Sequence, residues 1–380
     1  MIKNNQCTQC VMNDTDEEIE FDYRGVCNHC RQFAEVTKKY WFPNKEGEKY
    51  LNDILTRVRE DGKGKEYDCI LGLSGGVDSS YLALKAKDWG LRPLVMHVDA
   101  GWNTETAVSN IEKIVKYCNY NLHTHVVDWE EMRDLHLSYF CSGLSNQDVP
   151  QDHIFFSSLY HFAIKNKIRY ILSGGNIATE GVMVSGWHGG SAMDSISLKA
   201  VHRKYGERPL KLYKMISFWQ YYIWYPLIKK MRTIRPLNYL PYNKEIAIKE
   251  IEKKCGWRSY GRKHGESLFT KIFQNNYLPR KYGYDKRLPH LSSLILSGQI
   301  TREFAIEKLK EPLYDPFELE IDLDYFCKKL RITREQYENF ICGQKKNYSD
   351  FPNWMRLYSL IKLAQKYFEK IFKIRINIYS

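Results

Sequence analysis

Two cysteine pairs near the N-terminus have the spacing of metal ligands. Two residues separate Cys7 from Cys10, sixteen residues follow, and Cys27 and Cys30 repeat the first spacing. Each pair can form a tight turn that directs two sulfurs at one ion, and four thiolates complete a tetrahedral site with no open position. The spacing predicts a structural zinc site. An iron–sulfur cluster would use the same ligands, and unligated thiols or a redox role are further alternatives.

A glycine-rich segment, LGLSGGVDSS at residues 71–80, has the composition of a phosphate-binding loop. It follows the apolar run YDCILGL and precedes a predicted helix, so its backbone amides and the helix N-terminus can attract a phosphate. The Gly-Lys-Ser/Thr of a Walker-A loop is absent,. Asp78 lies in the first helical turn and could meet a magnesium ion. The alternative is a purely structural glycine turn. The predicted nucleotide-binding residues of the loop are Ser74, Gly75, Gly76, Asp78, Ser79 and Ser80.

Strands and helices alternate around this loop. Strands are predicted at 67–73, 91–99, 122–129 and 168–175, and helices at 77–89, 104–117 and 153–167. Alternation of this kind predicts an α/β fold with a doubly wound parallel sheet, in which ligands bind at the carboxyl ends of the strands. Asp99 closes the second strand there. Gly174, Gly175 and Asn176 close the fourth and complete the predicted nucleotide site.

The remaining sequence divides around this core. We predict a zinc-binding module at 1–33, a helical connector at 34–66, the ATP-binding core at 67–200, a basic substrate- and phosphate-binding region at 201–290 and a helical C-terminal region at 291–380. The aromatic segment 216–228 is predicted to be a helix that is buried or faces a partner. Thr301 is predicted to cap a helix.

Composition narrows the class of protein. The 380 residues are 43% hydrophobic and 14% aromatic, which suits a packed core and excludes a disordered chain,. The net charge is +12, and residues 199–290 contain 22 Lys and Arg against 6 Asp and Glu. Such a segment suits nucleotides, nucleotide-sugars or nucleic acid, and the alternative is a solvated basic face. No apolar run is long enough to span a membrane, and the polar start does not resemble a signal peptide, so we expect a cytoplasmic protein.

The string SGGVDSS resembles the PP-loop of the ATP-pyrophosphatase superfamily. Its members hold the β- and γ-phosphates of ATP on this loop, and a substrate oxygen is adenylated. With CTQCVMND, FDYRGVCNHC, HVDAGWNTE, NQDVPQDH, LSGGNIATEG and GYDKRLPHLSSLILSGQITRE, the sequence resembles the N-acetyl sugar amidotransferases of bacterial surface-polysaccharide (LPS O-antigen) biosynthesis from residue 7 to about 312.

The resemblance implies an ATP-dependent ligase. It would convert an acetamido group on a nucleotide-sugar or nonulosonic acid into an acetamidino group, using ATP and Mg²⁺. Ammonia would come from a separate glutaminase paired with a cyclase-like barrel subunit, and nucleic acid is not an expected partner. The candidates for positioning or proton transfer are Asp99, Asp152, His153 and Glu180. Those for holding phosphate or substrate are Arg235, Lys263, His264, Lys281, Lys286 and Arg287. A structural histidine at position 153 and solvated basic residues are the alternatives.

Two other functions fit parts of the pattern. A tRNA thiolase can combine zinc cysteines with a PP-loop, and the basic segment would suit RNA. Thiolation usually needs cysteines near the loop, whereas Cys118, Cys141 and Cys255 are isolated in the sequence. The non-enzymatic interpretation is a zinc-containing adaptor that binds nucleic acid and has a degenerate nucleotide-binding fold. The intact glycine loop argues against this interpretation.

Overall fold

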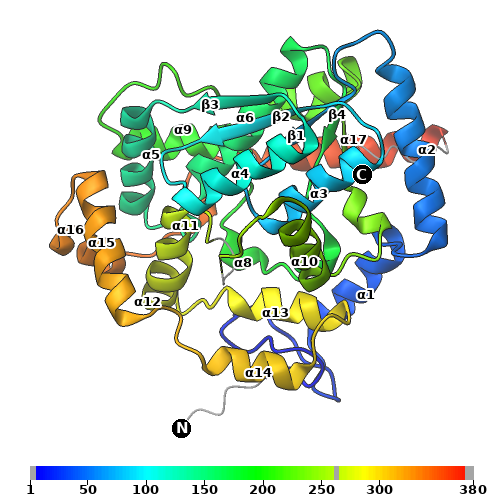
Figure 1. The fold of residues 1–380 in the computed structure, drawn as a ribbon. Helices are drawn as coiled ribbons and strands as arrows, with labels where there is room; N and C mark the ends of the chain where they lie inside the picture. The colour runs from blue at the N-terminus through cyan, green and yellow to red at the C-terminus, as the bar shows by residue number, and fades with distance from the viewer. Residues whose placement is uncertain (1–5, 261–264, 373–380) are drawn as a thin grey trace.

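A five-stranded parallel sheet lies in the upper part of the molecule in the view of Figure 1. The computed structural model describes residues 6–260 and 265–372. The strand order is β3-β2-β1-β4-β5, and all four neighbouring pairs are parallel. Leu71 on β1 lies opposite Val95 and Leu172 on the flanking strands. The predicted parallel α/β class is confirmed. The strands are β1 (Cys69–Gly72), β2 (Pro93–Asp99), β3 (Leu122–Val126), β4 (Tyr170–Leu172) and β5 (Arg232–Ile234).

Helices cover both faces of the sheet. Cys69 and Leu71 pack in one core cluster, while Ile70, which points to the opposite face, packs in another,. Because the central strand is buried on both faces, its sequence is a continuous run of apolar residues. The first cluster includes α2 (Lys45–Asp61), α3 (Val77–Asp88), α4 (Glu105–Cys118) and α10 (Lys244–Cys255). The second includes α6 (Val149–Lys165), the π-helix η1 (Gln220–Ile228) and α17 (Met355–Phe372).

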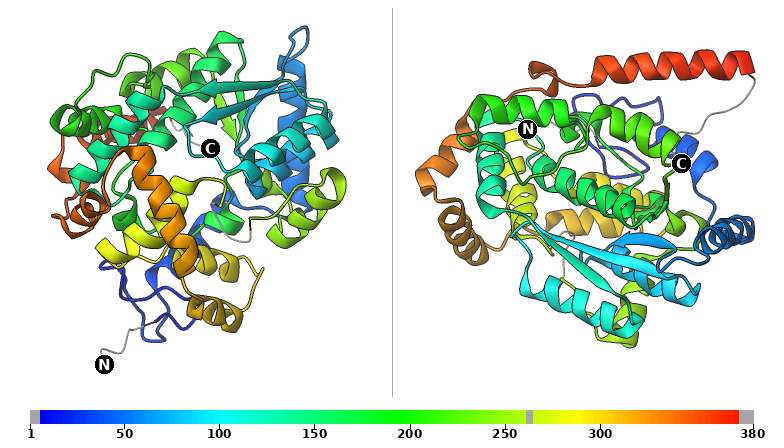
Figure 2. Two further views of the ribbon diagram at one scale, coloured as in Figure 1. Left: turned by 60° about the vertical axis from the view of Figure 1, so that its left-hand side comes forward. Right: turned by 90° about the horizontal axis from the view of Figure 1, so that it is seen from above.

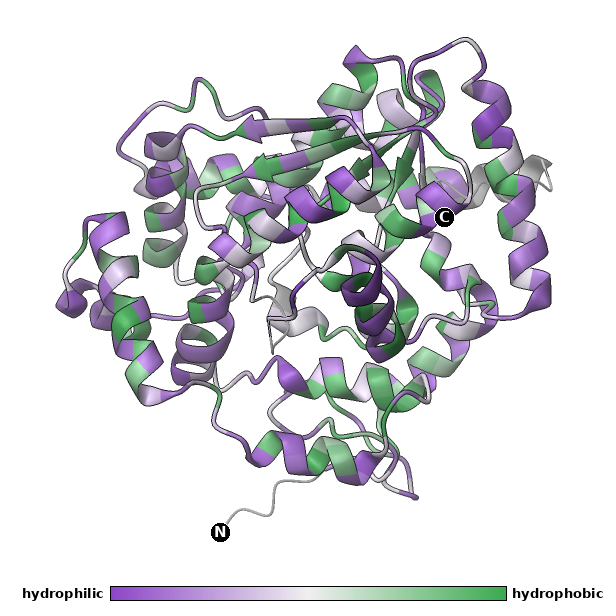
Figure 3. Ribbon diagram, in the orientation of Figure 1, coloured by the Kyte–Doolittle hydropathy of each residue, from purple (hydrophilic) through white to green (hydrophobic). Residues whose placement is uncertain are grey.

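Hydropathy follows this layering. Figure 3 shows hydrophobic residues along the inner strands of the sheet and hydrophilic residues along most of α2 at the periphery. Figure 2, right, shows α17 along one edge of the molecule. No helix in the described part of the chain is long and apolar enough to cross a membrane.

Two further layers flank the sheet. On one side, α5 (Trp129–Ser142) packs with the C-terminal segments α11 (Leu268–Ile272), η3 (Phe273–Tyr277), α12 (Leu278–Tyr282), α15 (Pro316–Leu330) and α16 (Arg334–Cys342). Below the sheet in Figure 1, the cysteine pairs pack with α1 (Asn28–Tyr40), α7 (Ile177–Glu180), α8 (Ser185–His188), α13 (Arg287–Leu296) and α14 (Arg302–Lys310). The remaining elements are α9 (Ser195–Tyr205), η2 (Pro236–Tyr239) and η4 (Tyr348–Asp350).

Two predicted helix starts are confirmed by hydrogen bonds. The hydroxyl of Thr104 accepts a hydrogen bond from the amide of Ala107 and caps α4. Thr301 caps α14 in the same way through the amide of Phe304. In both cases a threonine oxygen satisfies one of the unpaired amides of the first helical turn.

Other elements differ from the prediction. β5 extends the sheet beyond the predicted core, within the basic region, and the third strand ends at Val126 and is followed by α5. The aromatic segment forms η1, which contains Pro226 and buries Tyr222 and Tyr225. The second cysteine pair lies at the start of α1, so this helix begins inside the predicted zinc module. The proposed domain bounds remain predictions.

Candidate functional site

The glycine loop is a tightly held turn between β1 and α3. Gly75 has φ +84°, and an added Cβ would lie 2.8 Å from the carbonyl oxygen of Ala107, so only glycine fits there,. The Gly75 carbonyl accepts hydrogen bonds from Trp257 Nε1 at 2.9 Å and from the Tyr260 hydroxyl at 3.0 Å. Ser79 Oγ accepts from the amide of Ser74 at 3.3 Å. These contacts fix the turn in advance of any ligand.

The end of β4 lies directly against this loop. An added Cβ on Gly174 would be 3.0 Å from the amide nitrogen of Ser79, so the two turns approach closely. Asn176 caps α7 by accepting from the amide of Thr179 at 3.0 Å, and it donates to the Gly174 carbonyl at 3.1 Å. Asn176 is buried and lines neither cavity described below, so it shapes the turn instead of contacting a nucleotide directly.

Two adjoining cavities open at these turns. The loop cavity, of about 520 Å³, is lined by the glycine loop, the end of β4, the start of α10, and residues of α13 and α14. The larger cavity, of about 570 Å³, lies between the ends of β1 and β2, α6 and α13. Ser74, Glu180 and Glu266 line both cavities. The glycine loop therefore stands at the junction where contents of the two cavities can meet.

The structure brings together about half of the predicted site. The predicted residues that line the loop cavity are Ser74, Gly76, Asp78, Ser79, Gly174, Gly175 and Glu180. Asp152 and Lys286 line the larger cavity. Asp78 Oδ1 accepts a hydrogen bond from the Tyr242 hydroxyl. These residues come from four separate segments that meet at the carboxyl edge of the sheet.

His153 does not belong to this site. It is fully buried, its Nδ1 lies 2.9 Å from the carbonyl oxygen of Ala192, and its Nε2 accepts from the amide of Ile216 at 3.2 Å. Burial lowers the pKa of His153 to about 4, so the ring is neutral,. The structural alternative is therefore the one that the geometry supports. Ser80 is likewise directed into the core, where its Oγ has no hydrogen-bond partner.

Four other candidates also lie away from the cavities. Lys281 is buried and donates to the carbonyl of Phe340. Arg287 pairs with Asp285 at 2.8 Å and donates to carbonyls at the end of α14. Arg235 is exposed before η2. Asp99 accepts from the amide of Gly101 at 2.8 Å and thereby shapes the loop after β2. Lys263 and His264 lie outside the described residues.

The electrostatics of the larger cavity centre on Asp152. Burial raises the pKa of Asp152 well above its usual range, Asp148 and Glu180 raise it further, and Lys286 opposes the shift. Asp148 accepts hydrogen bonds from Thr270 Oγ1 at 3.0 Å and from Gln151 Nε2 at 3.2 Å. A carboxyl group that is perturbed by burial and by named charges in a cavity is typical of functional sites.

Sequence reasoning did not place three of the lining residues in the site. Lys244 and Lys308 line the loop cavity, and His290 lines the larger one. Glu266 reaches the junction because residues 265–268 pair with the loop after β2, where the amide of Thr104 donates to the Glu266 carbonyl at 3.0 Å. No local pattern could reveal that contact. His290 follows Lys286 by four residues and so shares its helical face, which was an available signal.

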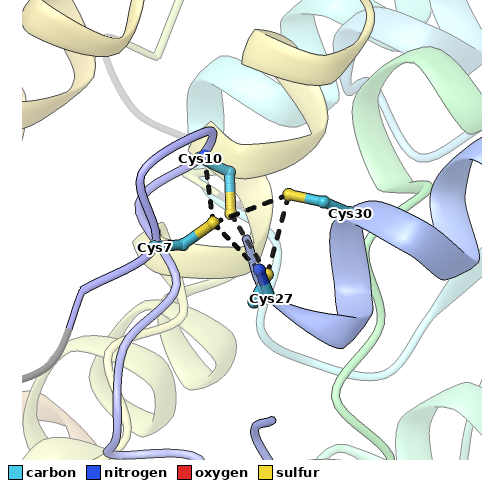
Figure 4. A group of neighbouring side chains, drawn as sticks. All are labelled: Cys7, Cys10, Cys27 and Cys30. Carbon is cyan, nitrogen blue, oxygen red and sulfur yellow. Dashed lines mark hydrogen bonds between the residues drawn. The ribbon is translucent and has the colours of Figure 1, made fainter. Parts of the chain in front are cut away.

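The four cysteines converge on one point (Figure 4). All are buried, and their sulfurs lie within 4.8 Å of one another. The distance from Cys10 Sγ to Cys27 Sγ is 3.6 Å and that from Cys7 Sγ to Cys30 Sγ is 3.8 Å. Thiolates about 2.3 Å from a tetrahedral zinc ion are about 3.8 Å apart. The distances therefore fit a single ion, since a cluster would divide the four cysteines among two or four irons and place some of the sulfurs farther apart,.

The fold and the site define a parallel α/β protein whose glycine loop faces two joined cavities, with a four-cysteine site beneath. Residues 266–366 match the model of the family described as "LPS biosynthesis protein WbpG-like, C-terminal domain". Over these residues, the match confirms the predicted resemblance to proteins of lipopolysaccharide biosynthesis. The matched region contributes Glu266, Lys286 and Lys308 to the cavity walls.

The solved structures that are similar to this chain include two synthetases. "Structure of NMN synthetase from Francisella tularensis" has 14% identity and a TM-score of 0.34, and the alignment covers 71% of this chain and 98% of that one. "NH3-dependent NAD synthetase from Campylobacter jejuni subsp. jejuni NCTC 11168 in complex with the nitrate ion" has 13% identity and a TM-score of 0.32, with 79% and 97% covered. The comparison with curated proteins found no match.

Proposed function

We propose that the chain is a PP-loop ATP-dependent amidotransferase, which adenylates the oxygen of an acetamido group and replaces it with nitrogen from ammonia. The observation that supports this most is the position of the glycine loop. It forms the start of the twelve-residue helix α3 and stands where the two cavities join. A triphosphate held in the loop cavity would present its α-phosphorus to an acceptor in the larger one.

The lining of the loop cavity suits a triphosphate. The N-terminus of α3 attracts phosphate oxygens, and the ammonium groups of Lys244 and Lys308 add positive charge for the departing pyrophosphate,. The carboxylates of Asp78, Glu180 and Glu266 are the residues that would hold Mg²⁺ in this cavity,. Such an ion neutralises phosphate charge when bound.

The lining of the larger cavity suits an N-acetylated sugar. Amides at Asn103 and Gln151 can bind hydroxyl and acetamido groups, while Phe155 and Phe273 can cover an apolar face,. An amide carbon is a poor electrophile, and adenylation of its oxygen creates a good leaving group. We propose a nucleotide-sugar or nonulosonic acid as the acceptor, which agrees with the lipopolysaccharide family of residues 266–366.

Partners and the metal complete the proposal. Free ammonia is mostly protonated at neutral pH, so a separate glutaminase with a cyclase-like barrel subunit would deliver the neutral nucleophile. The four cysteines would hold a structural Zn²⁺,.

A tRNA thiolase is the weaker candidate, because no described cysteine lines either cavity. Cys69, for example, is buried in β1.

The reaction can be tested directly. Release of pyrophosphate and AMP from ATP would be measured with ammonium chloride, a panel of N-acetylated nucleotide-sugars and bulk tRNA, followed by mass spectrometry. We expect a sugar product in which NH replaces O, formed in step with AMP. Turnover that needs tRNA and a sulfur donor, with no response to sugars, would assign the chain to the thiolases.

The glycine loop offers a variant for the same assay. We expect Gly75→Ala to lower pyrophosphate release by about tenfold or more, because alanine is strained at this φ and its Cβ would collide with the Ala107 carbonyl,. Gly64→Ala is the matched control, since Gly64 also has positive φ (+73°) but an added Cβ there meets no atom within 4 Å. Wild-type turnover and KM for ATP in Gly75→Ala would contradict the loop assignment.

A further inference from the structure

His290 is fixed at the wall of the larger cavity by contacts between α13 and α7. Its Nδ1 lies 3.0 Å from the carbonyl oxygen of Thr179, the residue before Glu180. Further along α13, Ser293 Oγ accepts from the amide of Val182 at 2.9 Å, and Ser297 Oγ donates to the carbonyl of Ala178 at 2.8 Å. Three hydrogen bonds thus join the two segments, and the position of the imidazole relative to the junction is set.

The contact with Thr179 also determines the tautomer. A carbonyl oxygen can only accept, so Nδ1 must bear the hydrogen. In the neutral ring Nε2 then holds the lone pair. An imidazole oriented in this way by a backbone carbonyl is a common arrangement for a proton acceptor.

The charged neighbours of His290 in the cavity are less suited to accept a proton from a nucleophile. Asp148 and Asp152 come from α6, Glu180 from α7, Glu266 from the segment before α11, and Lys286 from the start of α13. Asp148 accepts two hydrogen bonds, Glu180 and Glu266 also line the loop cavity, and Lys286 is a cation. Burial disfavours the charged form of Asp152,. His97 also lines this cavity, but its Nε2 already accepts a hydrogen bond from Asn103 Nδ2 at 3.0 Å. The orientation of the His290 ring therefore favours His290 as the proton acceptor of this wall.

We propose, on the basis of the proposed function, that His290 is the residue that accepts a proton from the attacking ammonia. The ammonia lone pair forms a bond to the carbon of the adenylated acetamido group, which gives a tetrahedral adduct with a positively charged nitrogen. Nε2 of His290 accepts one proton from that nitrogen. The electron pair that this leaves on nitrogen forms the C=N bond as the C–O bond breaks. AMP leaves with the electron pair of the C–O bond, and the imidazolium releases its proton to solvent.

The test separates the two half-reactions. His290→Asn retains a side-chain NH that can donate to the Thr179 carbonyl but removes the acceptor at Nε2. Adenylation is measured as acceptor-dependent exchange of labelled pyrophosphate into ATP, and the second step as amidine formation from ammonium chloride. We expect exchange within about threefold of wild type and amidine formation lower by about 100-fold.

Rescue of a variant by added imidazole distinguishes a catalytic role of His290 from a structural one. We expect added imidazole to restore part of the amidine formation of His290→Ala, an effect that a merely structural histidine would not show. His161→Asn is the matched control, because His161 is half-buried on α6, contacts the Met215 carbonyl and lines neither cavity. It should behave as wild type in both assays.

Three outcomes would overturn the assignment. His290→Asn could form amidine at the wild-type rate, or exchange and amidine formation could fall equally. His290→Ala could also fail to respond to imidazole while it remains folded. A wild-type chain that exchanges pyrophosphate with no N-acetylated acceptor and forms no amidine would instead reject the proposed function, and with it this step.

Discussion

At the residue scale, Asp152 is a carboxyl group held where its charge is unfavourable. It lies in the first turn of α6, and burial with Asp148 and Glu180 raises its pKa despite Lys286. The folded state therefore binds the proton more tightly than the unfolded state. Above the unfolded pKa of about 3.9 this difference lowers the stability of the fold, and the loss grows until the pH reaches the folded pKa.

We expect Asp152→Asn to stabilise the protein by about 1 kcal/mol at pH 7–8, because it removes the buried charge and keeps the shape. The gain should vanish below about pH 3, where the wild-type carboxyl is protonated in both states. Thermal unfolding over this pH range would measure it, with the exposed Asp53→Asn as control. We also expect the substitution to lower turnover, because residues of active sites often reduce the stability of a protein while they support its activity. A pH-independent gain would contradict the assigned pKa shift.

The histidines show why residue roles were only partly predictable. His153 and His290 both lie on helices, and the sequence singled out His153. Its two nitrogens are bound by Ala192 and Ile216, which are distant in the chain. His290 instead faces a cavity between α13 and α6. Such differences depend on tertiary contacts. The glycine loop was predictable, because its turn is specified by consecutive residues.

At the scale of elements, the loop after β2 is held by helices from the end of the chain. The amide of Leu268 donates to the Trp102 carbonyl at 3.0 Å. Lys329 on α15 donates to the Gly101 carbonyl, and its ammonium group lies 5.1 Å from the Trp102 ring centre and 4.9 Å from that of Trp129. Trp102 lines the larger cavity, so α15 positions part of its wall.

We expect Lys329→Met to lower stability by about 1 kcal/mol, since it removes one hydrogen bond and two cation–π contacts. The KM for the acceptor should rise several-fold while the KM for ATP changes little, because the loop lines only the larger cavity. Steady-state kinetics with each substrate varied would measure this. The exposed Lys328→Met is the control. An equal rise of both KM values would indicate general loosening of the fold.

The elements that were predicted share one physical feature. β1 and β2 are buried on both faces, and Thr104 caps the helix that follows β2, so the local pattern is strong,. β5 has only three residues and depends on pairing with β4, while η1 follows an aromatic run without clear periodicity. These two elements are determined by their neighbours in the fold.

At the scale of the whole molecule, the cysteine site supports the floor of both cavities. Arg302 on α14 donates to the carbonyls of Cys7 and Cys10, both at 2.9 Å, and the amide of Val11 donates to Ser292 Oγ on α13. The cysteines share a core cluster with Leu288 and Leu291 of α13. Because α13 bears His290 and α14 bears Lys308, the geometry of the site depends on this contact.

We expect the purified protein to contain one zinc ion per chain by elemental mass spectrometry. Removing the metal with a chelator, or substituting Cys27→Ser, should lower the melting temperature by about 10 °C or more, since a closed thiolate site contributes several kcal/mol to folding. Pyrophosphate release should be lost in parallel, because α13 and α14 would no longer be fixed beneath the cavities. Cys141→Ser, at an exposed position outside the site, is the control and should leave both unchanged. If the metal-free protein had the same melting temperature and turnover, the four thiols would stabilise this layer by packing alone. If the purified protein contained stoichiometric iron, the site would still be structural, but its ion would be iron and not zinc.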